Sequence, residues 1–192
     1  FHLSGLSVDG PTNQNLCCKA YHLLKDKFNL PPIHIFLHKQ IPTGAGLGGG
    51  SSDGAHTLLL LNNLFGLNIS HEILSEYALK LGSDCPFFIS NKPSFATSKG
   101  EILNAAPEIL RGSFLVIIKP SIAISTAMAY SMIKPEIPER KIAEIIAMPK
   151  EEWRHFLKND FEKTIVKQFP QIEKLKTNLY QAGAYYASMS GS

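Results

Sequence analysis

The chain has 192 residues, of which 44% are hydrophobic and 18% are charged, a composition typical of globular proteins. This length is enough to bury a sizeable core in one domain or in two small ones. The net charge of +3 is too small and too scattered to favour a nucleic acid partner. No apolar run is long enough to span a membrane, and no signal peptide is visible. The three cysteines match neither a disulfide framework nor a zinc pattern, so we expect a soluble cytoplasmic protein.

The first forty residues predict two strands around a helix. Phe1–Val8 indicates a strand entered in mid-pattern, so we expect that the natural N-terminus is missing. Thr12 or Asn13 can cap a helix that has Asn15 in its first turn, and prolines 31 and 32 follow this helix. Residues 33–39 alternate as a strand that places two histidines, His34 and His38, on one face. Two histidines without a third ligand favour a solvated face over a metal site. Lys39, at the end of the strand, is either an exposed lysine or a nucleotide contact.

The stretch from Ile41 to Asp53 is the most informative part of the chain. Five of the seven residues from Gly44 to Gly50 are glycines, and Ser51, Ser52 and Asp53 follow. Glycine tolerates positive φ and lets a ligand approach the backbone. Ser51 or Ser52 is a good N-cap for a helix that runs to about Phe65, with Gly66 at its end. A glycine-rich loop that opens a helix directs N–H groups and the helix dipole to one point, as phosphate sites do.

Other interpretations of this loop are weaker, and one remains open. A flexible linker is not normally fixed between a strand and a leucine-rich helix. Gly44, Gly46 and Gly49 fit the dinucleotide pattern, but the acid expected about 20 residues later is Glu72, in a second helix. The P-loop pattern lacks its lysine, and the glycine loop of protein kinases joins two strands. A tight structural turn remains the alternative to a phosphate site.

A single carboxylate, Asp84, follows the next predicted helix. Ser70 can cap that helix, and Gly82 can end it. Residues 86–89, directly after Asp84, are heavily apolar. An acid beside buried surface can serve as a general base if a cation keeps it ionised. It can equally form a turn that caps the next element, and the residues alone favour this structural role.

The second half of the chain is predicted to be mostly helical. Residues 93–100 look like a loop where the composition changes, so we place a boundary near Phe95 between domains 1–95 and 96–192. Residues 114–119 predict a buried strand ended by Pro120, and residues 184–189 predict a last strand. The other expected elements are a short helix capped by Ser125 or Thr126, a helix opened by Pro138, helical packing around Trp153, a helix that ends at Phe169 and one that runs to Ala182 before Gly183. Strands and helices without regular βαβ alternation favour an α+β fold.

Several motifs together resemble the GHMP kinases, the family of galactokinase, homoserine kinase and mevalonate kinase. The triple glycine before Ser51-Ser52-Asp53 is most similar to the branch that phosphorylates a cytidylated methylerythritol in isoprenoid biosynthesis. The other matching segments are Leu81–Phe88, Ala96–Leu103, Ser125–Ala127 with Ala129 and Tyr130, Asn159–Glu162 and Tyr186–Ser192. The resemblance covers nearly the whole chain.

The resemblance implies a fold and a site. It implies an N-terminal domain like ribosomal protein S5 domain 2, a ferredoxin-like C-terminal domain and a monomer or homodimer. ATP, with Mg²⁺ carried on it, would be bound by the loop, with Asn15 and Lys39 near the adenosine. The loop residues are Pro42, Thr43, Gly44, Ala45, Gly46, Leu47, Gly48, Gly49, Gly50, Ser51 and Ser52, with Asp53 at its exit. Asp84 would take the proton of the substrate's 2-hydroxyl, and Thr126 would line the substrate cavity. The resemblance implies no metal ion bound by the protein itself.

The sequence also departs from the family pattern. The family's N-terminal lysine, which pairs with the catalytic aspartate, is absent from these 192 residues, as is the Gly-Tyr-His segment that contacts cytosine. The third motif stops at Ser192, before its usual final glycine. We therefore expect the 192-residue chain to bind ATP weakly and to lack kinase activity; wild-type ADP release by this chain would contradict that. The alternatives are another small-molecule kinase of the family or a non-catalytic nucleotide-binding paralogue.

Overall fold

A computed structural model describes residues 1–122, 124, 126–133 and 137–191. The chain forms two compact units, Phe1–Glu108 and Ile109–Ser192. The units divide at Glu108, after a β-hairpin, whereas the composition changes near Phe95. Both helices and strands occur, which confirms the α+β class. Among the described residues, no helix is long and apolar enough to cross a membrane.

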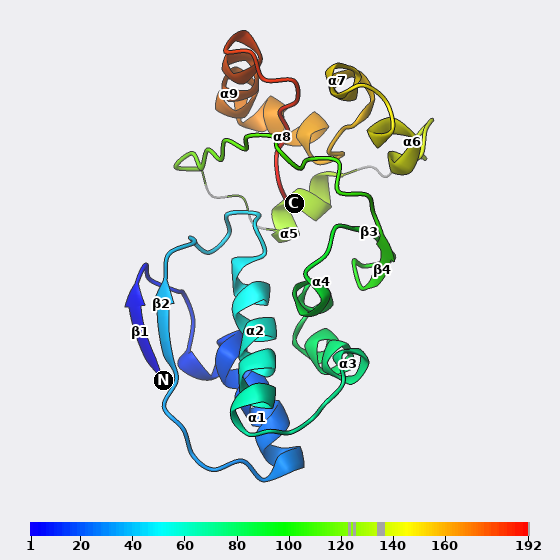
Figure 1. Cartoon of the computed structure of the whole chain (residues 1–192). Helices are drawn as coiled ribbons and strands as arrows, with labels where there is room; N and C mark the ends of the chain where they lie inside the picture. The colour runs from blue at the N-terminus through cyan, green and yellow to red at the C-terminus, as the bar shows by residue number, and fades with distance from the viewer. Residues whose placement is uncertain (123, 125, 134–136, 192) are drawn as a thin grey trace. The chain divides into compact units, whose positions relative to one another are not determined.

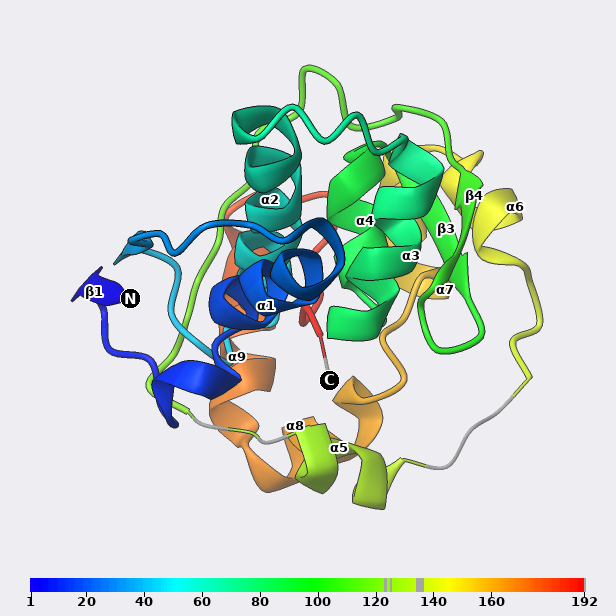
Figure 2. The same ribbon diagram turned by 90° about the horizontal axis from the view of Figure 1, so that it is seen from below.

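Four helices and two small sheets build the first unit. Helix α2 (Gly49–Leu64) lies between the first sheet on one side and α3 (His71–Leu81) and α4 (Cys85–Ser90) on the other (Figure 1). Helix α1 (Leu16–Phe28) packs beside α2 and α3 (Figure 2). These helices meet in one apolar core whose largest fully buried members are Leu24, Leu58, Leu61, Leu74 and Cys85.

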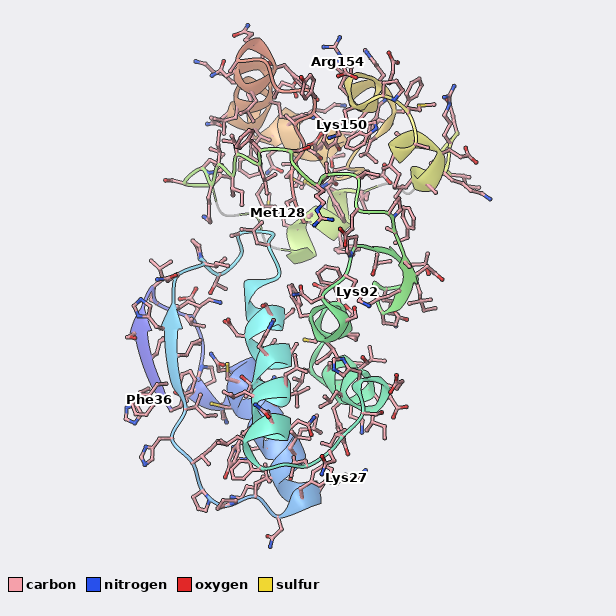
Figure 3. The ribbon with its side chains drawn as sticks, in the orientation of Figure 1. Lys27, Phe36, Lys92, Met128, Lys150 and Arg154 are labelled. Atoms are coloured by element: carbon pink, nitrogen blue, oxygen red, sulfur yellow. The ribbon has the colours of Figure 1, made fainter. Side chains whose placement is uncertain are left out.

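The first sheet confirms the two predicted strands in shorter form. Strand β1 (His2–Gly5) pairs in parallel with β2 (Phe36–Lys39), with Gly5 opposite Lys39. Gly5 has to be glycine, because a Cβ there would lie 2.3 Å from the Lys39 carbonyl oxygen. Phe36 stands on the outer side of the sheet and is 75% exposed (Figure 3).

The helix starts show where local sequence rules held and where they failed. Ser70 caps α3 as predicted, since its hydroxyl accepts the Ile73 N–H. Thr12 and Asn13 do not cap α1. They lie in a short 3₁₀ turn, η1 (Thr12–Gln14), and Asn15 is the N-cap, its Oδ1 accepting the Cys17 N–H at 2.9 Å. The predicted caps Ser51 and Ser52 are also wrong, because α2 already begins at Gly49.

Two elements near residue 90 were not predicted. The apolar residues after Asp84 form α4, which has Pro86 in its first turn. The segment interpreted as a loop is a hairpin, in which β3 (Ser94–Thr97) runs antiparallel to β4 (Ile102–Ala105) and Thr97 pairs with Ile102. Its short strands and its glycine, lysine and serine content hid the hairpin from a propensity argument.

The second unit is helical among its described residues. Its elements are α5 (Thr126–Met132), α6 (Ile142–Ile146), η2 (Lys150–Glu152), α7 (Trp153–Phe156), α8 (Glu162–Gln168) and α9 (Pro170–Gln181). Ala129, Ile165 and Ile172 form its core. The predicted helix ends near Phe169 and Gly183 are confirmed. Helix α6 has Lys141 rather than Pro138 before its first residue, so Pro138 does not open it. Ser125 lies outside the described residues.

Neither predicted strand of the second unit forms. Residues 114–118 lie in no strand, and their side chains are exposed, from 102% at Phe114 to 47% at Ile118. Residues 184–189 also lie in no strand. A strand needs a neighbour for its backbone hydrogen bonds, and the described part of this unit offers none.

Candidate active site

Alternating glycines shape the loop between β2 and α2. Gly44, Gly46 and Gly48 have φ values of +69°, +69° and +64°. This left-handed region is costly for residues with a Cβ, so glycine at alternate positions lets the chain turn sharply before the helix. Gly48 is the N-cap of α2, and no side chain caps the helix start.

The start of α2 therefore presents its backbone to the loop. The first N–H groups of a helix have no partner within the helix. The N–H of Ser52 is the donor to the Gly48 carbonyl, the N-cap acceptor of α2. With no capping side chain, these N–H groups and the helix dipole are suited to an anion. Ser52 faces elsewhere, since its Oγ lies 3.3 Å from His56 Nδ1.

A cavity of about 460 Å³ opens over this loop. It is lined by loop residues from Pro42 to Ser51 together with Asp53, and Asn15 and Lys39 also line it. The segment between β1 and α1 forms the opposite wall, which the sequence did not indicate. Its lining residues are Val8, Asp9, Gly10, Pro11, Thr12 and Gln14. Ser52 and Asp84 do not line this cavity.

A buried ion pair lies beneath the loop. Lys39 is only 5% exposed, and its ammonium donates to the carboxylate of Asp53 on α2. A Cβ on Gly49 would lie 3.3 Å from Lys39 Nζ. An unpaired ammonium would be costly at this depth, so the bond to Asp53 compensates the burial of Lys39 and holds it at the helix start. The sequence interpretation placed Asp53 at the exit of the loop but missed its partner.

Helix α4 supports the loop from the other side. A Cβ on Gly48 would lie 2.9 Å from Phe88 Cζ, so the ring of Phe88 packs directly on the loop backbone. The thiol of Cys85 is fully buried and hydrogen-bonds with the Ser51 side chain. Burial raises the pKa of this thiol above its ordinary value, so Cys85 is a packing residue rather than a nucleophile.

Asp84 lies at the start of this supporting helix. It occupies the N-cap position of α4, but its side chain makes no capping hydrogen bond. Asp84 thus lies in the turn before the next element and at its N-cap, as the structural interpretation expected, but its carboxylate does not cap the helix. A Cβ on Gly100, in the β3–β4 turn, would lie 3.4 Å from Asp84 Oδ1. The carboxylate thus lies beside the hairpin turn, at the start of the helix whose Phe88 packs on the loop.

The remaining predicted residues belong to other elements. Thr126 is the first residue of α5, in the second unit. His38 Nδ1 lies 3.0 Å from Ser4 Oγ, and His34 stacks with His2. Within the described part of the chain, no group of three potential ligands could hold a metal ion. Phe88 and Gly100 were missed because their roles depend on a helix and a hairpin that the sequence did not reveal.

Comparisons with known proteins agree with the site. The model of the GHMP kinases N terminal domain matches residues 15–92, which include the loop and Asp84. A 4-diphosphocytidyl-2-C-methyl-D-erythritol kinase of Bacteroides fragilis is 50% identical over 191 residues, which cover 100% of this chain and 70% of that protein. One of Cytophaga hutchinsonii is 42% identical, and the alignment covers 72% of it.

A solved structure shows the same fold. The crystal structure of a 4-(cytidine 5'-diphospho)-2C-methyl-D-erythritol kinase superposes with a TM-score of 0.72 at 29% identity, over 98% of this chain and 70% of that one. Identity of 50% over the full length of this chain exceeds what fold similarity alone produces. The chain therefore belongs to the GHMP kinases, in the family of the 4-diphosphocytidyl-2-C-methyl-D-erythritol kinases.

Proposed function

We propose that the protein transfers the γ-phosphoryl group of ATP to the 2-hydroxyl of 4-diphosphocytidyl-2-C-methyl-D-erythritol, a step in isoprenoid precursor biosynthesis. One observation carries this proposal: α4 joins the two halves of a phosphoryl-transfer site. Its Phe88 packs on Gly48 of the loop, and Asp84 stands at its start. One helix thus contacts the loop that would hold the polyphosphate and presents the base for the acceptor alcohol, and phosphoryl transfer depends mainly on such positioning.

Each part of the site has a role in this reaction. The loop from Pro42 to Ser52 and the start of α2 bind the triphosphate through backbone N–H groups, with Asp53 holding Lys39 beneath them. For Asn15 and Lys39, which both line the loop cavity, we propose a place near the adenosine. Asp84 accepts the proton of the alcohol while the alcohol oxygen bonds to the γ-phosphorus and the bond to ADP breaks. Thr126 contacts the substrate.

The charge of the cavity suits a nucleotide that carries a cation. The charged lining residues are Asp9, Asp53 and Lys39, so the acids outnumber the lysine. The loop contributes no lysine of its own. Backbone N–H groups supply only partial charge, and we therefore propose that Mg²⁺ enters with ATP and balances the charge of the phosphates.

We extend the proposal to the domains and the location. The first unit corresponds to a GHMP kinase N-terminal domain, like ribosomal protein S5 domain 2, and the second to a ferredoxin-like C-terminal domain, as the resemblance implies. The three cysteines are buried free thiols, which suits the cytoplasm.

The decisive experiment measures ADP release by the full-length protein with three alcohols: the cytidylated methylerythritol, mevalonate and homoserine. We expect turnover with the first alone. Asp84→Asn should lower kcat by about 10²-fold or more, the usual contribution of a general base, and leave binding of an ATP analogue unchanged. Asp26→Asn, an exposed aspartate on α1, is the matched control. Full activity of Asp84→Asn would remove Asp84 from the mechanism, and turnover of mevalonate or homoserine instead would reassign the substrate.

A further inference from the structure

The turn between β3 and β4 lies against Asp84, the proposed general base. Gly100 passes beside Asp84 so closely that its missing Cβ would lie 3.4 Å from Oδ1. Two residues of this turn have positive φ, Ser98 at +61° and Gly100 at +106°. Such a conformation is unfavourable for serine, and unfavourable backbone persists where the surroundings enforce it, often beside functional groups.

The N–H groups of this turn already have partners inside the turn. Lys99 N–H donates to Glu101 Oε2 at 2.8 Å, and Gly100 N–H donates to the Thr97 carbonyl at 3.1 Å. Glu101 also accepts its own N–H and a hydrogen bond from the Ser98 side chain. These bonds, with that from its own N–H the strongest, hold the pKa of Glu101 below its ordinary value. One ionised carboxylate thus binds the N–H groups of Lys99 and Glu101, the residues on either side of Gly100.

Asp84 itself remains open. Within the described residues, no hydrogen bond to its carboxylate is formed, although it lies at the N-cap of α4. A general base needs an oxygen lone pair within hydrogen-bond reach of the proton it takes. Bonds from N–H groups to an ionised carboxylate are among the stronger ones in proteins, so a free N–H of the turn would compete with the substrate for this oxygen.

We propose that Glu101 is a positioning residue for the phosphoryl transfer. It binds the N–H groups of Lys99 and Glu101 inside the turn, so that the turn packs beside Asp84 without donating to it. The carboxylate of Asp84 then stays available to the substrate hydroxyl, while the glycine backbone excludes water from one side. This inference rests on the proposed role of Asp84 as the base.

The test compares two substitutions of one residue in the full-length protein. Glu101→Ala removes the acceptor and frees the two N–H groups, which should lower kcat by about tenfold, less than loss of the base itself. The KM for the alcohol should rise several-fold, whereas the KM for ATP should not change. Glu101→Gln keeps an acceptor oxygen for the Lys99 N–H and should stay within about twofold of the wild type. Glu108→Ala, the same change at an exposed glutamate of this unit, should have no effect.

Several outcomes would overturn the proposal. Wild-type kinetics for Glu101→Ala would do so. An equal loss of kcat in Glu101→Ala and Glu101→Gln would also do so, because it would mean that the charge of Glu101, and not its acceptor oxygen, is needed. If Glu101→Ala does not fold, the backbone N–H resonances of Lys99 and Glu101 provide the answer. The chemical shifts of these two N–H groups should change in Glu101→Gln but not in Asp84→Asn. The reverse pattern would mean that these groups donate to Asp84. An active Asp84→Asn would instead contradict the proposed function, whatever Glu101 does.

Discussion

Two segments rich in small residues are held in shape in opposite ways. The loop from Gly44 to Gly50 is shaped by its own backbone, with three glycines at positive φ and no side chain that caps the helix after it. The segment from Ala187 to Gly191, near the other end of the chain, is held by side chains of α8, α9 and the loop before α8. The first segment lies in the first unit, and the second lies in the second unit.

The bonds to the second segment are numerous. Asn159 Nδ2 donates to the carbonyls of Met189 and Gly191 at 3.0 and 2.9 Å. Glu162, which is 9% exposed, accepts the Met189 N–H and also binds the ammonium of Lys176. The Tyr180 hydroxyl bonds to both the N–H and the carbonyl of Ala187 at 3.2 Å.

The two segments therefore differ in their backbone hydrogen bonds. No side chain caps the helix start after the loop, whereas backbone groups of the C-terminal segment bond to side chains of the protein. The shape of the loop depends on which residues lack a side chain. The shape of the C-terminal segment depends on which residues have one. Side-chain truncation should therefore damage the C-terminal segment, and added methyl groups should damage the loop.

The largest effect is expected from Glu162→Ala. It leaves the Met189 N–H and the partly buried Lys176 ammonium without their common partner, which should lower the free energy of unfolding by about 3 kcal/mol. Urea unfolding followed by the fluorescence of Trp153, the only tryptophan and a residue of the same unit, measures this. Glu151→Ala, at an exposed glutamate, and Thr43→Ala in the loop should each change stability by less than about 0.5 kcal/mol. If Glu162→Ala also lowered the free energy of unfolding by less than about 0.5 kcal/mol, the C-terminal segment would not depend on this carboxylate.

In the loop, Gly48→Ala should have the next largest effect. Alanine is unfavourable at φ +64°, and its Cβ would meet the Phe88 ring at 2.9 Å. We expect a loss of about 2 kcal/mol and weaker binding of an ATP analogue. Gly50→Ala is the matched control, since Gly50 lies within α2 and a Cβ there meets no atom within 4 Å. It should be neutral or stabilise the protein by up to about 1 kcal/mol. Equal losses in both variants would mean that any added side chain disturbs the loop.

The sequence alone predicted a glycine-rich loop that opens a helix, because the signal is local. Gly44 to Gly50 and the leucine-rich helix after them are contiguous, and their chemistry needs no distant residue. It could not predict that Phe88 packs on Gly48, or that Lys39 pairs with Asp53, because these contacts depend on how α4 and β2 pack against α2. Asp84 was recognised only through the family resemblance, since a lone acid after a helix carries no pattern.

The predicted strands of the second unit failed for a related reason. Residues 114–118 have strong strand preference, but β-propensity reports packing on neighbouring strands rather than an intrinsic backbone preference. The described part of this unit contains no strand that could pair with them. The same holds for Tyr185 and Tyr186, whose segment is bound by side chains instead of by a sheet.

Asn159→Ala tests the side-chain contacts more gently than Glu162→Ala. It removes the two bonds to the carbonyls of Met189 and Gly191 and the bond from Phe161 N–H to Asn159 Oδ1. Carbonyls at this partly exposed site can bind water instead, so we expect a loss of about 1 to 1.5 kcal/mol, measured again by Trp153 fluorescence. Asn178→Ala, at an exposed asparagine on α9, should cost much less. Equal effects at the two positions would mean that the segment keeps its shape without Asn159.

The smallest effect is expected at alkaline pH, where the two units should begin to lose stability at different pH values. The free energy of unfolding should fall by less than about 1 kcal/mol for each titrating group. All three cysteines lie in the first unit, and burial raises the pKa of each above the ordinary 9.0. In the second unit, burial raises the pKa of Tyr186 above 10.0. Burial disfavours the Lys176 ammonium, but its bond to Glu162 outweighs this and raises its pKa above 10.5.

A group whose pKa is raised by folding stabilises the protein fully below its unfolded pKa and loses this contribution as the pH rises. The first unit should therefore weaken from about pH 9, and the second only from about pH 10. In moderate urea, thiol reactivity reports on the first unit and Trp153 fluorescence on the second. Cys85→Ala should narrow the gap between the two transitions, because it removes one of the thiols that respond first. If Trp153 responded at the lower pH, the buried thiols would not control the alkaline stability of the unit that carries the loop.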